Sequence, residues 1–260
     1  MGVLSSPDEP RPGAPAALLL NSGLIHRVGP NRLYVHIARE LASRGFHSLR
    51  FDLSGLGDSP MPMAGDGLSI EDRSQVDIAS AMRAVREQVG TERFVMMGLC
   101  SGAFMAHHAT VDSVAVVGCA QFDGHVYPTR GLYVRHYASR VLQPGAWIRF
   151  LRRKLASEVP LSMGPEQDEA FVPNRISRDA FARDLAVLVD RGTKLLFVLT
   201  RGGLQEVGYA RQLNDCVPEV DLDRHADILY MPDSDHTLTL RRHQRMVVER
   251  TADWMDRSFP

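Results

Sequence analysis

The sequence lacks several features that would assign it to a specialised class of protein. Its 260 residues contain three cysteines, Cys100, Cys119 and Cys216, which do not form a disulfide framework. Its net charge is −1, and no apolar run approaches the length of a transmembrane helix. These absences exclude a disulfide-stabilised scaffold and a membrane span. They also argue against nucleic acid as a partner, because no excess of positive charge would attract it.

Targeting and cofactor motifs are also missing. Residues 1–15 lack the basic and apolar regions of a signal peptide and are rich in proline, serine and acidic residues, so we expect a flexible tail. Free thiols are typical of a reducing compartment, and we therefore predict a cytoplasmic protein. No glycine-rich phosphate loop stands between a strand and a helix, and His107, His108 and His225 lack the spacing of metal ligands. We accordingly predict neither a cofactor nor a metal site.

One short stretch, Gly98-Leu99-Cys100-Ser101-Gly102, has the pattern of a nucleophile elbow. An apolar run typical of a buried strand precedes it at 93–97, and a helical pattern follows it at 104–109. In this context a tight turn exposes the central side chain at the edge of a sheet, and the flanking glycines leave room for it. The Ser101 amide would lie at a helix N-terminus, where it can donate to an oxyanion. The alternative is that Cys100 is only a small apolar residue at the end of a strand.

Strands and helices alternate on both sides of one long insertion. Strands are predicted at 17–20, 46–53, 93–97, 114–120, 194–200 and 228–231, and the main helices at 31–44, 70–89, 206–213 and 238–255. The first long helix is expected to be capped by Asn31. Alternation of this kind predicts an α/β protein with a mostly parallel sheet covered by helices on both faces. Ligands of such sheets bind at the carboxyl ends of the strands.

The insertion at 123–191 has no strand of comparable quality, and we interpret it as a helical lid over the active-site edge. The core would then comprise 16–122 and 192–260. A basic cluster at 149–154 could contact a phosphate-bearing carrier, but it is more typical of a solvated helix face.

From Ala16 onward the pattern resembles the α/β-hydrolase fold. The residues that carry this resemblance are Arg50-Phe51-Asp52 with Gly55-Leu56-Gly57-Asp58-Ser59, the Gly98–Gly102 stretch, and Asp235-His236-Thr237. Within the superfamily the chain is similar to small bacterial hydrolases associated with exosortase systems, near the serine aminopeptidase-like group. The features that suggest this narrower likeness are Arg27-Val28-Gly29 and the Gly-Leu-Cys-Ser-Gly-Ala box, which has cysteine where serine is usual.

The resemblance implies that Cys100 is the nucleophile and His236 the general base, in the chain order expected for this fold. The acid departs from the family pattern, because Gly202-Gly203 stand where it usually follows the strand at 194–200. Glu206 is the nearest carboxylate, although it could simply stabilise a helix start. Asp123, after the strand at 114–120, is the second candidate, although Asp123-Gly124 could be a plain turn. We favour Glu206 slightly and keep both.

The oxyanion hole is expected to combine the amide of Ser101 with one from Gly23 or Leu24. The usual His-Gly is replaced by Asn21-Ser22-Gly23, but backbone donors do not depend on that histidine. We interpret Asp52 and Asp58 as structural residues of a glycine-rich turn.

These residues predict an enzyme that acts on an ester or thioester through a Cys100 acyl-enzyme. It would be an esterase- or thioesterase-like hydrolase or an acyltransferase, because thioesters exchange readily with thiols and amines. The partner would be a small-molecule or carrier-bound acyl substrate, and we also consider a homodimer. The alternative is a non-acyl catalyst, or a ligand-binding or accessory protein, on the same fold without a covalent intermediate.

Overall fold

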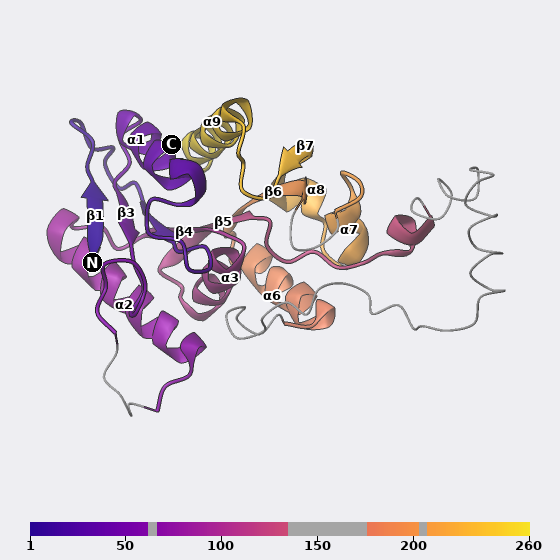
Figure 1. Cartoon of the computed structure of the whole chain (residues 1–260), viewed down its shortest axis with the longest axis horizontal. Coiled ribbons are helices and arrows are strands. Elements are labelled where there is room, and N and C mark those ends of the chain that lie inside the picture. The colour runs from indigo at the N-terminus through magenta and orange to yellow at the C-terminus, as the bar shows by residue number, and fades with distance from the viewer. Residues whose placement is uncertain (62–66, 135–175, 203–206) are drawn as a thin grey trace, which may run out of the picture.

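The computed structural model describes residues 1–61, 67–134, 176–202 and 207–260. A seven-stranded sheet runs through the middle of the molecule in the order β1-β3-β2-β4-β5-β6-β7 (Figure 1). All neighbouring strands are parallel except β1, which is antiparallel to β3. The strands are β1 (Gly2–Ser5), β2 (Ala16–Leu20), β3 (Ser48–Phe51), β4 (Phe94–Leu99), β5 (Val116–Phe122), β6 (Lys194–Gly202) and β7 (Ala226–Asp235).

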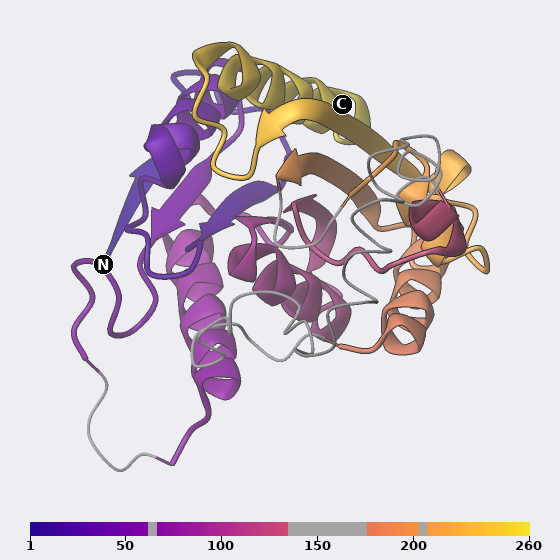
Figure 2. The same cartoon turned by 45° about the vertical axis from the view of Figure 1, so that its right-hand side comes forward.

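Helices cover both faces of the sheet, as the alternating pattern predicts (Figures 1 and 2). The helices whose full extent lies in the described residues are the 3-10 turn η1 (Pro30–Arg32), α1 (Leu33–Ser43), α2 (Ile70–Val89), α3 (Ser101–Asp112), α6 (Arg178–Asp190), α7 (Gln212–Cys216), α8 (Leu222–His225) and α9 (Arg241–Ser258). Buried side chains of α2, α3 and α6 share one apolar cluster with one face of the strands, and those of α1 and α9 share a second cluster with the other. Successive residues of a strand point to opposite faces, so Met96 of β4 lies in the first cluster and Met97 in the second.

Helix α2 begins and ends where the sequence predicts. The hydroxyl of Ser69 accepts a hydrogen bond from the amide of Asp72 at 3.0 Å, which caps the first turn. Ile78 and Val85 face the core from one stripe of the helix. Gly90, at φ 72°, ends it in the left-handed conformation that glycine tolerates.

The prediction of a loose tail is wrong for the first residues of the chain. Residues 2–5 form β1, which pairs along the whole of β3. This pairing uses backbone groups and covers an otherwise open sheet edge, so it needs no apolar pattern in the sequence. Further along, the guanidinium of Arg11 donates to the Phe259 carbonyl at 3.1 Å and to Asp256 at 2.9 Å. The composition of this segment therefore says little about its contacts.

The boundaries predicted for the lid are wrong at their C-terminal end. Helix α6 lies inside the predicted 123–191 segment, yet Phe181, Leu185 and Leu188 are fully buried in the core. Their spacing places them on one face of the helix, which packs with α3 beneath the sheet. Residues 135–175 lie outside the described residues, and a lid over that range stays a prediction.

Two expectations about helix starts are also corrected. Asn31 does not cap α1, which begins at Leu33, because Asn31 itself takes up a left-handed φ of 49°. Its side chain instead donates to the carbonyl of Thr237 at 3.0 Å and ties the start of α1 to the loop after β7. The helix predicted at 206–213 begins only at Gln212. Within the described residues, none of the helices combines the length and the apolar composition that crossing a membrane requires.

Candidate active site

Cys100 occupies the turn between β4 and α3, at the carboxyl end of a central strand. Its backbone has φ 60° and ψ −119°, a conformation that an L-residue adopts only where the surroundings enforce it. The Cys100 amide donates to the Phe122 carbonyl at 2.9 Å, and the amide of Leu99 donates to the buried hydroxyl of Tyr34 at 2.9 Å. Neighbouring elements on both sides therefore hold the turn, as the elbow pattern predicts.

The two glycines of the elbow are required by close backbone approaches. A Cβ on Gly98 would stand 2.2 Å from the carbonyl carbon of Gly102. A Cβ on Gly102 would stand 2.6 Å from the carbonyl oxygen of Asn21. No side chain fits at either distance, so glycine allows α3 to begin directly against β4 and against the loop that follows β2.

His236 and Asp123 come together from the ends of two other strands. Asp123 follows β5 directly, and His236 follows β7 directly. The Nδ1 atom of His236 lies 2.8 Å from Oδ2 of Asp123, whose carboxylate is buried. This contact orients the imidazole so that its other nitrogen, Nε2, can form a hydrogen bond with the Cys100 side chain.

The carboxylate of Asp123 is held by Thr200 at the end of β6. The Thr200 amide donates to Oδ1 of Asp123 at 2.6 Å, and its hydroxyl donates to Oδ2 at 2.5 Å. Asp123 has a left-handed φ of 48°, and its own amide donates to the carbonyl of Val198 at 2.8 Å. The sequence reasoning missed Thr200. The feature that could have indicated it is a hydroxyl side chain at the end of the strand after which the catalytic acid of this fold usually follows.

The ionisation of His236 reflects both of its neighbours. Burial lowers the pKa of His236, because it disfavours the charged imidazolium. The hydrogen bonds that His236 makes with Asp123 and Cys100, together with the charges of those groups, outweigh burial and raise this pKa to about 10. The imidazole therefore carries a second proton at neutral pH and stands as a cation between the Asp123 carboxylate and the Cys100 sulfur.

The structure thus brings together three of the four predicted catalytic residues, Cys100, His236 and Asp123. The fourth, Glu206, lies outside the described residues. Of the two carboxylates that the sequence left open, with Glu206 slightly favoured, Asp123 contacts the histidine.

The predicted oxyanion donors are only partly free. Ser101 is the first residue of α3, so its amide has no acceptor within the helix. The amide of Gly23 donates to the hydroxyl oxygen of Ser101 at 2.6 Å and is already engaged. Leu24, next in the loop, has an exposed side chain. The loop after β2 therefore lies against the elbow through a contact between Gly23 and Ser101.

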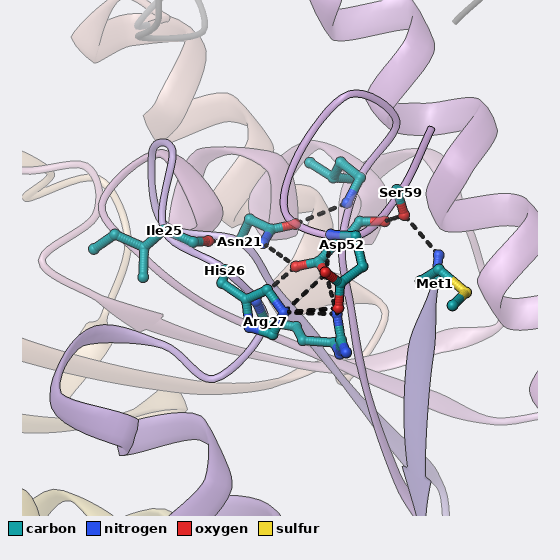
Figure 3. A network of polar contacts seen from close by, with 9 residues as sticks. Met1, Asn21, Ile25, His26, Arg27, Asp52 and Ser59 are labelled. Carbon is teal, nitrogen blue, oxygen red and sulfur yellow. Dashed lines mark hydrogen bonds and ion pairs between the residues drawn. The ribbon is translucent and has the colours of Figure 1, made fainter. Parts of the chain in front are cut away.

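A buried polar network holds both ends of this loop, as Figure 3 shows. Asp52, after β3, accepts hydrogen bonds through Oδ1 from the Asn21 side chain at 3.1 Å and from the Arg27 amide at 2.6 Å. The Asn21 side chain also donates to the Ile25 carbonyl at 2.8 Å and accepts from the Leu53 amide at 2.8 Å. Burial raises the pKa of Asp52, but its hydrogen bonds, led by the one from Asn21, hold that pKa below its usual range. These contacts agree with the structural role expected for Asp52.

His26, Asp52 and Asp58 each offer one ligand atom within 4.8 Å of the others and are a candidate cation site. The guanidinium of Arg27 lies among them, with Nη1 2.7 Å from Nε2 of His26 and 2.7 Å from Oδ2 of Asp58. It also forms an ion pair with Asp52 (Figure 3). The positive charge of Arg27 therefore lies between the two carboxylates, and a metal ion would have to displace it.

Comparisons with known proteins support the fold. A family model described as alpha/beta hydrolase fold matches residues 16–123. A search of curated proteins found no significant match. Among solved structures, the esterase domain of a Rhodothermus marinus protein is 19% identical, with 98% of this chain and 91% of that chain covered and a TM-score of 0.56. Proline iminopeptidase from Mycobacterium smegmatis is 14% identical, with coverages of 99% and 94% and a TM-score of 0.59.

A further solved structure, an alpha-beta serine hydrolase homologue from Coxiella burnetii, is 12% identical, with coverages of 97% and 89% and a TM-score of 0.56. Likeness at these identities concerns the fold. The resemblance drawn from the sequence is confirmed at the level of the fold, while the narrower likeness to exosortase-associated hydrolases stays a prediction.

Proposed function

On the premise that this chain has the α/β-hydrolase fold, we propose that it is an esterase- or thioesterase-like hydrolase or an acyltransferase that works through an acyl-enzyme on Cys100. The observation that carries the proposal is the hydrogen-bonded series Asp123–His236–Cys100 at the carboxyl ends of β5, β7 and β4. The fold and its esterase and hydrolase neighbours support a hydrolase-type enzyme. The strained turn at Cys100 supports a nucleophile at that position.

In the first half-reaction, the sulfur of Cys100 attacks the acyl carbon of an ester or thioester. The raised pKa of His236 means that the imidazole holds the proton that Cys100 gives up. The tetrahedral intermediate has its negative charge on the former carbonyl oxygen, near the amide of Ser101. His236 then gives its proton to the leaving alcohol or thiol, the bond to the leaving group breaks, and a thioester on Cys100 remains.

In the second half-reaction, water or another acceptor attacks this thioester. His236 takes the proton of the acceptor, and the Cys100 sulfur departs as the leaving group. Asp123 holds the Nδ1 proton of His236 throughout and stabilises the imidazolium. Amides are less favoured as substrates, because a thiolate leaves the tetrahedral intermediate more easily than an unprotonated amine.

One observation favours the alternative of a non-acyl catalyst or binding protein on the same fold. The amide of Gly23 is taken up by Ser101 and is not open to a substrate oxygen. If no second oxyanion donor exists, the site would bind a carbonyl compound without turning it over. Acylation of Cys100 separates the two functions directly.

The test is intact-protein mass spectrometry after exposure to p-nitrophenyl esters and acyl-thioesters of several chain lengths. We expect an acyl adduct on the wild type that is absent from Cys100→Ala and strongly reduced in His236→Ala. Cys119→Ala is the matched control, because Cys119 is buried in β5 and burial raises the pKa of its thiol to about 12. This control should be acylated like the wild type. If the wild type gives neither an adduct nor turnover with any donor, the non-acyl alternative holds instead.

A further inference from the structure

The hydrogen bond between Gly23 and Ser101 affects which groups can bind an oxyanion at this site. In the oxyanion hole expected from the fold, a backbone amide of the loop after β2 binds the oxyanion directly. Here that amide donates to the hydroxyl oxygen of Ser101 at 2.6 Å. Direct binding by Gly23 would require this hydrogen bond to break and the serine side chain to rotate away.

The hydrogen of the Ser101 hydroxyl makes no hydrogen bond within the described residues. Ser101 is only 4% exposed, and its oxygen accepts from Gly23. Within 1–61, 67–134, 176–202 and 207–260, no acceptor for this hydrogen is present. A hydroxyl carries one donor beside its two acceptor lone pairs, so this group can still donate to an acceptor that a substrate would bring.

The hydroxyl and a helix-start amide belong to the same residue, the one that follows the nucleophile. Ser101 is the next residue after Cys100, and its own amide also has no acceptor within α3. Amide and hydroxyl therefore belong to one buried residue beside the nucleophile. The Asn21 carbonyl lies close to Gly102, so the loop after β2 passes directly against this end of the helix.

We propose that the hydroxyl of Ser101 is a catalytic group, which donates to the oxyanion together with the Ser101 amide. Gly23 takes part indirectly: its amide donates to the hydroxyl oxygen, polarises the O–H bond and strengthens its donation. This inference rests on the proposed acyl-enzyme function. It explains how the chain can lack a free amide at Gly23 and still hold an oxyanion with two donors.

The test compares two reactions of Cys100 that differ in their need for an oxyanion hole. Acylation by p-nitrophenyl acetate passes through an oxyanion, whereas alkylation by iodoacetamide is a displacement at carbon that forms none. We expect Ser101→Ala to lower the acylation rate roughly 100-fold, the usual effect of losing one oxyanion donor, and to leave alkylation unchanged. Ser101→Thr keeps a hydroxyl and should restore much of the acylation rate. Ser101→Gly gives the same comparison if the alanine variant does not fold.

Each other outcome has a distinct meaning. Equal or faster acylation of Ser101→Ala would overturn the inference, because it would show that Gly23 donates directly once it is released. A parallel loss of alkylation and acylation would also overturn it, because the hydroxyl would then act on Cys100 itself. If the wild type is alkylated but never acylated, the proposed function fails, and the role of Ser101 fails with it.

Discussion

Replacing Asp123 by asparagine should disable the site through the tautomer of His236. Oδ1 of Asp123 accepts from the Thr200 amide at 2.6 Å, and Oδ2 faces both the Thr200 hydroxyl and Nδ1 of His236. The amide of Thr200 can only donate, so the single oxygen of an asparagine must stay with it. The asparagine NH₂ then points at Nδ1 of His236, which must become an acceptor. The remaining imidazole proton then moves to Nε2 of His236. This nitrogen can no longer accept the proton of Cys100.

The expected fall in the acylation rate of Asp123→Asn follows from the loss of proton transfer by His236. Without the carboxylate, the pKa of His236 falls, because burial remains and the neighbour that contributes most to raising it is gone. General acid–base catalysis typically contributes roughly 100- to 10,000-fold to a rate. A thiol ionises more readily than a hydroxyl, so we expect the lower end, about a 100-fold loss of acylation rate in Asp123→Asn.

The assay is the pre-steady-state release of p-nitrophenolate, followed together with thermal unfolding to confirm that the variant is folded. Glu206→Gln is the matched control and should acylate within about twofold of the wild type, because the proposal gives Glu206 no part in proton transfer. Wild-type rates in a folded Asp123→Asn would refute the reasoning. So would a large loss in Glu206→Gln, since it would make Glu206 the acid.

Three further predictions follow from the same contacts. Gly102→Ala should lower Tm by about 2–12 °C, since its Cβ would stand 2.6 Å from the Asn21 carbonyl oxygen and overpacking costs about 1–3 kcal/mol; calorimetry showing an unchanged Tm would contradict this. The pKa of His236 rises on folding from 6.5 to about 10, so its contribution to stability is complete below pH 6.5 and lost as the pH rises through 10. The Tm difference between the wild type and His236→Gln should therefore shrink over that pH range. A constant difference would argue against the raised pKa. Thr200→Val should slow acylation about 10-fold, because the Thr200 hydroxyl no longer donates to Asp123, and Thr200→Ser should restore the rate if the hydroxyl alone matters.

The parts of the fold that local patterns encode could be predicted from the sequence. The apolar residues that recur at helical spacing predict a helix from about Ile70 to Val89, and α2 has these bounds. The alternation of strands and helices predicts the parallel sheet covered on both faces. The glycines around Cys100 predict the elbow, because few other patterns require such close backbone approach.

Other parts of the fold depended on partners far away in the sequence. Strand β1 exists because β3 offers an open edge, which composition does not reveal. Helix α6 falls within the segment that the sequence predicts as a lid, because its place in the core depends on contacts with elements from earlier in the chain. Asn31 has the residue type of a helix cap but bonds to Thr237 instead.

For the candidate site, the sequence by itself determined which residue types stand next to which strand ends: Cys100 after β4, Asp123 after β5 and His236 after β7. It could not choose between Asp123 and Glu206, because that choice depends on which carboxylate meets the imidazole in space. Only the tertiary structure decided that Asp123 faces His236 and that Thr200 supports it from the neighbouring strand. It also decided that the amide of Gly23 is bound to Ser101, since a hydrogen bond between a loop and a helix start depends on how β2 and β4 lie side by side.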